Sequence, residues 1–144
     1  MPFEGRQRAA LLDRCWSIYL SLTGAFNVPE SFHLEFPVIA ESALVIGALH
    51  VTVPIGADLT VSLREEYAFE RQRLSVSRYS YNVTDLAGNN LLRADNLPFH
   101  RTDYRKRLLT HPPHHFHDQR GRVFSFSGDV HKFIADAKTF LSSR

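Results

Sequence analysis

Two stretches of the chain gather residue types that can move protons and hold a phosphate. They contain Arg78, Arg93, Asp95 and Asn96, followed by His100, His111, His114, His115 and His117. The imidazole of histidine changes charge near pH 7, so it can accept or donate a proton at little cost. Arginine binds phosphate and stabilises the charge that develops on it during transfer. Together these residue types are the parts of a metal-independent ribonuclease.

In such an enzyme a base takes the proton of the RNA 2′-hydroxyl, and an acid protonates the leaving oxygen. We expect His115 and His117 to exchange these protons, with His100 or His114 assisting. The reaction could instead be another phosphate or nucleotidyl transfer to RNA, because the same groups serve that chemistry.

The arginines and the aspartate have supporting roles in this hypothesis. Arg78 and Arg93 are expected to hold the scissile phosphate, and Asp95 to orient one histidine or arginine. The alternative is structural: the arginines form cross-strand ion pairs on a solvated face and the histidines lie in a surface loop. The chain would then be a non-catalytic module that binds RNA or protein.

The histidines also allow a metal-binding interpretation. His114, His115 and His117 form an HHxH element, and His100 and His111 lie upstream of it. Imidazole suits zinc, nickel or copper. However, the spacing matches no common structural zinc pattern and no thiolate accompanies it. On an extended chain His115 and His117 point the same way and His114 points to the other side. The sequence therefore assigns no metal and no cofactor, and a structural metal on the loop remains an alternative.

Composition limits the class of protein. The chain has 144 residues, of which 44% are hydrophobic and 22% charged, as is usual for one globular domain. Charge is uneven: residues 1–63 hold three basic and six acidic residues, whereas residues 64–144 hold fourteen basic and nine acidic ones. A basic, histidine-rich second half suits a polyanion such as RNA. The fingerprints of nucleotide-binding loops and serine hydrolases are absent.

The N-terminal sequence favours a cytoplasmic protein. It carries charges where a signal peptide needs an apolar core. The longest apolar stretch, Ala43 to Ala57, is interrupted by His50 and Pro54 and is shorter than the roughly 20 residues that cross a bilayer. The one cysteine, Cys15, cannot form an internal disulfide, and we expect it in the core.

Hydrophobic periodicity predicts a helix at each end of the domain. The first, within residues 1–24, has an apolar side formed by Leu12, Cys15, Trp16, Tyr19 and Leu22. Trp16 is therefore expected in the core, unless this helix packs on a second copy in a homodimer. The second helix spans residues 128–144, with Ser127 as its N-cap.

Four strand-like runs lie between the helices, within residues 43–97. Residues 98–127, rich in proline and histidine, are expected to form an ordered loop, and Glu65, Glu66 and Glu70 a solvated strand end. This order predicts one α+β domain over residues 1–144. Its sheet is an antiparallel meander of four strands, or slightly more, with the N-terminal and C-terminal helices packed on one face.

A tight turn at Asp85–Gly88 predicts the register of the last hairpin. Tyr79 would lie opposite Ala94, and Arg78 opposite Asp95. The tyrosine face is expected in the core, and the face carrying the arginines is expected to be polar.

The segment from Arg78 to His100 resembles the TumE-type family of toxin–antitoxin proteins. The matching positions are Tyr79, Ser80, Tyr81, Asp85, Gly88, Arg93, Asp95, Asn96, Pro98 and His100, followed by Pro113, His114, His115, Phe116 and His117. Phe99 departs from the pattern, where a second histidine is expected. The resemblance implies a toxin that pairs with a helix-turn-helix antitoxin; its action on RNA is inferred from the histidine and arginine chemistry.

Overall fold

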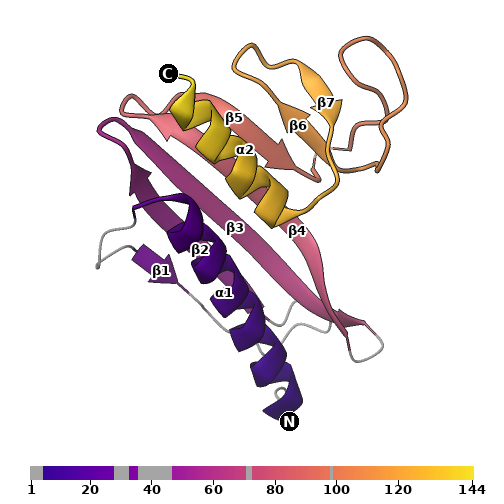
Figure 1. The fold of residues 1–144 in the computed structure, drawn as a ribbon. Coiled ribbons are helices and arrows are strands. Elements are labelled where there is room, and N and C mark those ends of the chain that lie inside the picture. The colour runs from indigo at the N-terminus through magenta and orange to yellow at the C-terminus, as the bar shows by residue number, and fades with distance from the viewer. Residues whose placement is uncertain (1–4, 28–32, 36–46, 71–72, 98) are drawn as a thin grey trace.

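A seven-stranded antiparallel sheet carries two helices on one face (Figure 1). The computed structural model describes residues 5–27, 33–35, 47–70, 73–97 and 99–144. The elements within these ranges are α1 (Gly5–Ala25), β1 (His33–Glu35), β2 (Gly47–Ile55), β3 (Leu59–Glu70), β4 (Arg73–Asp85), β5 (Asn90–Asp95), β6 (His115–His117), β7 (Val123–Ser125) and α2 (Val130–Ser142). The predicted α+β domain, with both terminal helices on one side of a meander, is confirmed. No described helix is long and apolar enough to cross a membrane.

The meander is longer than the four expected strands, which correspond to β2–β5. β1 adds an edge strand before them, and β6 and β7 add a short hairpin after them. The prediction of a loop over residues 98–127 is therefore wrong for this hairpin. Three-residue strands are too short to show an alternating pattern, and they form because the edge of β5 offers unpaired backbone groups. Residues 1–4, residues 43–46 and Pro98, which also belong to predicted features, lie outside the described residues.

The hairpin of β4 and β5 has a different register from the predicted one. Asp85 and Asn89 close the turn, and Gly88 adopts a φ of 84° there. A bulge at Leu91 then adds one residue to β5, so Tyr81, not Tyr79, lies opposite Ala94. The shift amounts to two residues, which leaves the paired side chains on their predicted faces, whereas Leu91, expected on the polar face, is buried in the core at the bulge. Tyr79 and Tyr81 are in the core, as expected.

The core lies between this sheet face and the two helices. Alternating residues of β2–β5 meet the apolar side of α2, where Phe133 contacts Tyr81. The residues that α2 buries are Val130, Phe133, Ile134 and Ala137, at the predicted spacing. Its N-cap is Asp129, whose carboxylate accepts a hydrogen bond from the His131 backbone N–H, and not Ser127 as predicted. Gly128, with a φ of 86°, turns the chain between the two positions.

Helix α1 presents a different side to the sheet from the one predicted. Leu11, Ile18 and Leu22 are buried, whereas Trp16 is 61% exposed. The prediction that Trp16 belongs to the core is therefore wrong, and Leu12 is exposed as well. Cys15 packs against the edge of the core and is half-buried. The helix is turned by one residue because Arg14 points inward, toward a buried carboxylate on β3.

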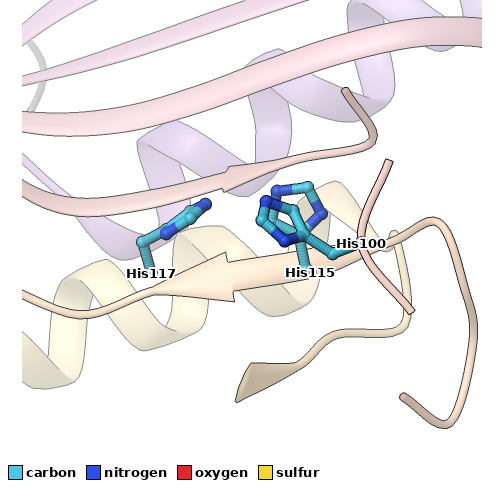
Figure 2. Close-up of side chains that lie close together, drawn as sticks. All are labelled: His100, His115 and His117. Atoms are coloured by element: carbon cyan, nitrogen blue, oxygen red, sulfur yellow. The ribbon is translucent and has the colours of Figure 1, made fainter. Parts of the chain in front are cut away.

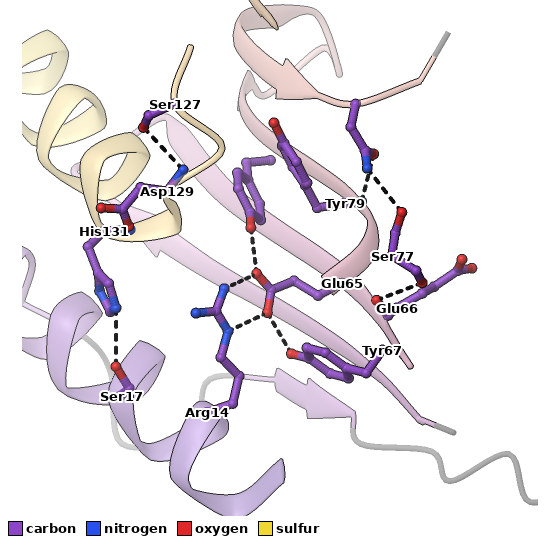
Figure 3. Close-up of polar contacts among 12 residues, drawn as sticks. Arg14, Ser17, Glu65, Glu66, Tyr67, Ser77, Tyr79, Ser127, Asp129 and His131 are labelled. Atoms are coloured by element: carbon purple, nitrogen blue, oxygen red, sulfur yellow. Dashed lines mark hydrogen bonds and ion pairs between the residues drawn. The ribbon is translucent and has the colours of Figure 1, made fainter. Parts of the chain in front are cut away.

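That carboxylate belongs to Glu65, which is only 1% exposed. Arg14 donates to both of its oxygens, at 2.9 and 2.6 Å, and the hydroxyls of Tyr67 and Tyr81 donate to it at 2.6 and 2.5 Å (Figure 3). The prediction of a solvated strand end is wrong for Glu65. Burying an ion requires such partners, and the pair with Arg14 fixes the rotation of α1. A second polar contact, 3.1 Å between Ser17 Oγ and His131 Nε2, joins α1 to α2.

We predict that Arg14→Met destabilises the domain by about 3 kcal/mol, because it leaves the Glu65 carboxylate buried without its cation. Methionine keeps the apolar stem of the side chain, so the loss reports mainly the charge. Arg8→Met on the exposed side of the same helix should change the free energy of unfolding by less than about 0.5 kcal/mol. Chemical denaturation measures both values. An Arg14→Met variant as stable as Arg8→Met would show that Arg14 does not compensate the carboxylate.

Candidate functional site

The sheet face opposite the helices, called here the open face, carries two neighbouring rows of polar side chains. Strand pairing aligns His50, Arg64, Ser80, Asp95 and His115 in the first row, which crosses β2 to β6. The second row consists of Thr52, Ser62, Asn82, Arg93 and His117. Side chains alternate along a strand, so both rows point away from the helices. Each row ends at a histidine of β6.

The three side chains of β6 alternate between the two faces of the sheet. His115 and His117 lie on the open face, opposite Asp95 and Arg93 of β5. Phe116 lies between them, opposite Ala94, and packs on the covered face against Phe133. The expectation that His115 and His117 point the same way is confirmed, and the packing of the partly buried Phe116 against the core is the physical reason.

His100 joins these two side chains from the segment that follows β5. Its ring centroid lies 4.3 Å from that of His115 and 5.7 Å from that of His117, while the rings of His115 and His117 are 4.9 Å apart. Figure 2 shows the three imidazoles gathered beside β6. We call His100, His115 and His117 the histidine cluster.

Asp95 connects the cluster to the sheet. Its carboxylate is buried, and Arg93 Nε donates to Oδ2 at 2.5 Å. Oδ1 lies 2.5 Å from Nε2 of His115, an ion-pair distance, but this contact lacks hydrogen-bond alignment. Neither Oδ1 nor Nε2 has another hydrogen-bond partner among the described residues. The other nitrogen of His115, Nδ1, donates to the Pro113 carbonyl at 2.9 Å.

These contacts set the charges of the pair. Burial alone would raise the pKa of Asp95, but His115 and Arg93 outweigh burial and hold the pKa below its usual value. Burial alone would lower the pKa of His115, but Asp95 and the Pro113 carbonyl raise it. Asp95 is therefore ionised at neutral pH, and His115 favours its protonated form.

The pKa values of the other two imidazoles of the cluster are shifted in the opposite direction, downward. Burial is the main cause that lowers the pKa of His100, and the nearby charge of His115 adds to it. The pKa of His117 is lowered by the same two causes in the same order. At neutral pH each therefore favours the uncharged ring, with one nitrogen lone pair free to accept a proton or to bind an ion.

His114 is separated from the cluster by the sheet. Its Nδ1 lies 2.9 Å from the hydroxyl of Tyr79, and the two rings stack on the covered face. His111 is exposed on the preceding turn, where its Nδ1 contacts the Thr110 hydroxyl at 2.9 Å. The structure thus brings His100, His115 and His117 together and leaves the expected assistant His114 outside.

The predicted polar residues of the hairpin divide between two roles. Arg93 and Asp95 contact each other and the cluster, as described above. Asn96 is structural, because its side chain accepts from the Tyr79 backbone N–H and donates to the Ser77 carbonyl across the irregular part of β4. Arg78 lies exposed on the open face, opposite Glu66 and not opposite Asp95 as predicted.

A hollow of about 500 Å³ lies on the open face beside the cluster. Its lining includes three arginines, two acidic residues of the open face and two small polar residues: Arg64, Arg78, Arg93, Glu66, Asp95, Ser80 and Asn82. A smaller hollow adjoins it, sharing Arg93 and Asn90 and reaching His117. Arg93 therefore stands between the arginine-lined hollow and the cluster. Arg64 was missed as a site residue, although the alternation of β3 already placed it on the polar face.

No protein-family model, curated protein or solved structure matches this chain. The function must therefore be argued from the geometry of the open face.

We predict that Gly128→Ala destabilises the protein through His114. A Cβ at Gly128 would lie 2.8 Å from His114 Cε1 and Nδ1, closer than atoms can approach, at a φ of 86°. Gly88→Ala is the matched control, because Gly88 has a φ of 84° but nothing within 4 Å of its Cβ position. Both variants should lose about 1 kcal/mol to backbone strain, and Gly128→Ala about 1–3 kcal/mol more to the clash. Equal losses in chemical denaturation would show that His114 moves aside freely.

Proposed function

We propose that this protein binds RNA on the open face of its sheet and cleaves the phosphodiester backbone at the histidine cluster. One observation carries the proposal: three imidazoles, two from β6 and one from the segment after β5, meet beside Arg93, at the end of an arginine-lined hollow. Arginines next to a group of imidazoles are suited to a negatively charged ester whose reaction requires proton removal.

The arginines support the binding half of the proposal. Arg64 and Arg78 are exposed in the hollow, and neither forms an ion pair with a described residue. Adjacent strands lie about 4.8 Å apart, so the first row spans about 14 Å from Arg64 to His115. A stacked nucleic-acid strand carries one phosphate per about 3.4 Å of its helix axis. The open face can therefore contact several phosphates of one strand.

The reaction we propose is transesterification within RNA. The 2′-oxygen forms a bond to phosphorus, the bond from phosphorus to the 5′-oxygen breaks, and a 2′,3′-cyclic phosphate results. The proton of the 2′-hydroxyl is released at the histidine cluster, and the 5′-oxygen takes up a proton as it leaves. Arg93, beside the cluster, stabilises the charge that builds on the phosphate oxygens. Asp95 positions Arg93 and His115.

The resemblance to TumE-type toxins supports the same face and adds a biological role. Among the positions that carry it, Arg93, Asp95, His100, His115 and His117 all belong to the site. We therefore propose a toxin that acts on RNA in the cytoplasm and is neutralised by a helix-turn-helix antitoxin. Expression without the antitoxin should stop growth.

We predict that the double variant Arg64→Ala/Arg78→Ala binds single-stranded RNA more weakly at low salt. Each lost phosphate contact reduces the slope of log K against log salt concentration by about 0.7, so the pair should reduce it by about 1.4. Fluorescence anisotropy with a labelled RNA over a salt series measures the slope. Arg8→Ala, on α1, is the matched control and should keep the parent slope. An unchanged slope in the double variant would move the binding site away from the hollow.

We predict that His117→Ala abolishes RNA cleavage and toxicity while the melting temperature stays within about 2 °C of the parent. The assay follows an end-labelled RNA pool on a gel, with Arg8→Ala as the active control. Fragments ending in a cyclic phosphate support the proposal. Intact RNA after incubation with the parent protein would contradict the proposed cleavage. Salt-sensitive binding without fragments would show that the protein binds RNA without cleaving it. Cleavage that persists in His117→Ala would exclude the cluster as the reaction centre.

A further inference from the structure

The histidine cluster has the donor set of a transition-metal site. A ring nitrogen of each of His100, His115 and His117 lies within 4.8 Å of the ring nitrogens of the other two. Zn–N bonds of about 2.0–2.1 Å place nitrogens about 3.4 Å apart around a tetrahedral ion. His100 and His117 are only half-buried, and His100 lies outside any helix or strand. Small side-chain rotations could therefore bring the ring nitrogens from within 4.8 Å of one another to the spacing of about 3.4 Å around an ion.

A buried ion pair borders the cluster. Nε2 of His115 and Oδ1 of Asp95 lie 2.5 Å apart and have no other hydrogen-bond partner among the described residues. Side chains of these two residues are 0% and 2% exposed, so water does not reach them. Buried polar atoms are normally satisfied. A divalent cation bound at Nε2, in place of the proton that His115 holds toward Asp95, would keep the carboxylate paired with a positive charge.

The surrounding contacts are those that orient metal ligands. A metal-bound histidine almost always donates its other ring N–H to a carbonyl or carboxylate, and His115 Nδ1 donates to the Pro113 carbonyl in this way. That bond leaves Nε2, which faces Asp95 Oδ1, as the nitrogen that an ion would bind after replacing its proton. Asp95 is held from its other oxygen by Arg93. The site is thus oriented from outside before any ion arrives.

We propose that His100, His115 and His117, with the Asp95 carboxylate beside them, bind a divalent transition-metal ion such as Zn²⁺. Three imidazoles favour zinc, cobalt, nickel or copper over magnesium and calcium, which prefer oxygen ligands. Three protein nitrogens leave a position open on the ion, toward Asp95 or solvent. This inference is independent of the RNA proposal, because it stands on the ligand atoms and not on the reaction. It differs from the metal-independent chemistry that the residue types alone predict.

The test is metal binding to the purified full-length chain after treatment with a chelator and removal of the chelator. Co²⁺ serves as a spectroscopic probe, because four-coordinate cobalt with nitrogen ligands absorbs visible light far more strongly than the hydrated ion. Zn²⁺ should then displace Co²⁺, and calorimetry should give one Zn²⁺ per chain, whereas Mg²⁺ should not compete.

The variants decide which residues hold the ion. His100→Ala and His117→Ala should each weaken Zn²⁺ binding at least about tenfold and abolish the cobalt spectrum, while keeping the circular dichroism of the parent. His111→Ala is the matched control, because this histidine is exposed on the same loop and outside the cluster, and it should bind like the parent. His115 is fully buried, so His115→Ala is not needed for the conclusion.

Three outcomes would overturn the proposal: no Zn²⁺ binding by the parent, equal binding by His100→Ala and His117→Ala, or loss of binding only in His111→Ala. The last two would mean that surface histidines pick up the ion. Failure here is separable from failure of the RNA proposal. Cleavage by a chain that binds no metal would contradict the ion site and support acid–base chemistry at the cluster. Metal binding without cleavage would support the ion site and contradict the ribonuclease proposal.

Discussion

A carboxylate removed from water must be matched by cations and hydrogen-bond donors, and among the described residues the sheet buries one on each face. On the covered face, Glu65 receives Arg14 and two tyrosine hydroxyls, and these contacts hold α1 in place. On the open face, Asp95 receives Arg93 and faces His115, and these contacts hold β6 and its histidines against β5. The first carboxylate organises the core, and the second organises the candidate site.

The two faces of the sheet differ in composition because both helices lie on one of them. The covered face packs against α1 and α2, so most of its side chains are hydrophobic. The open face keeps its polar rows accessible, and the rows lead from Arg64 to the histidines of β6. A sheet with one solvated face often alternates in this way. Here the alternation also delivers His115 and His117 to the same place.

His115 and His117 illustrate why residue types did not decide the chemistry. By type, both could exchange protons, as the ribonuclease hypothesis assumed. In the folded chain, His115 is held between the Pro113 carbonyl and the Asp95 carboxylate, so its ring is already engaged. His117 contacts the Gly121 backbone, and neither His117 nor His100 is held by a carboxylate as His115 is. The same three rings therefore offer two kinds of chemistry, proton transfer and the binding of an ion.

The amino-acid sequence by itself determined the α+β class, the terminal helices, the central strands and the polar face of the last hairpin, because hydrophobic periodicity and turn residues are local signals. Tertiary structure alone decided which side of α1 faces the core, because that depends on where Glu65 lies on β3. It also decided that His100 joins His115 and His117 while His114 does not. A cluster built from β6 and the segment after β5 forms only when strand pairing, and the packing of Phe116 against the core, bring its members together.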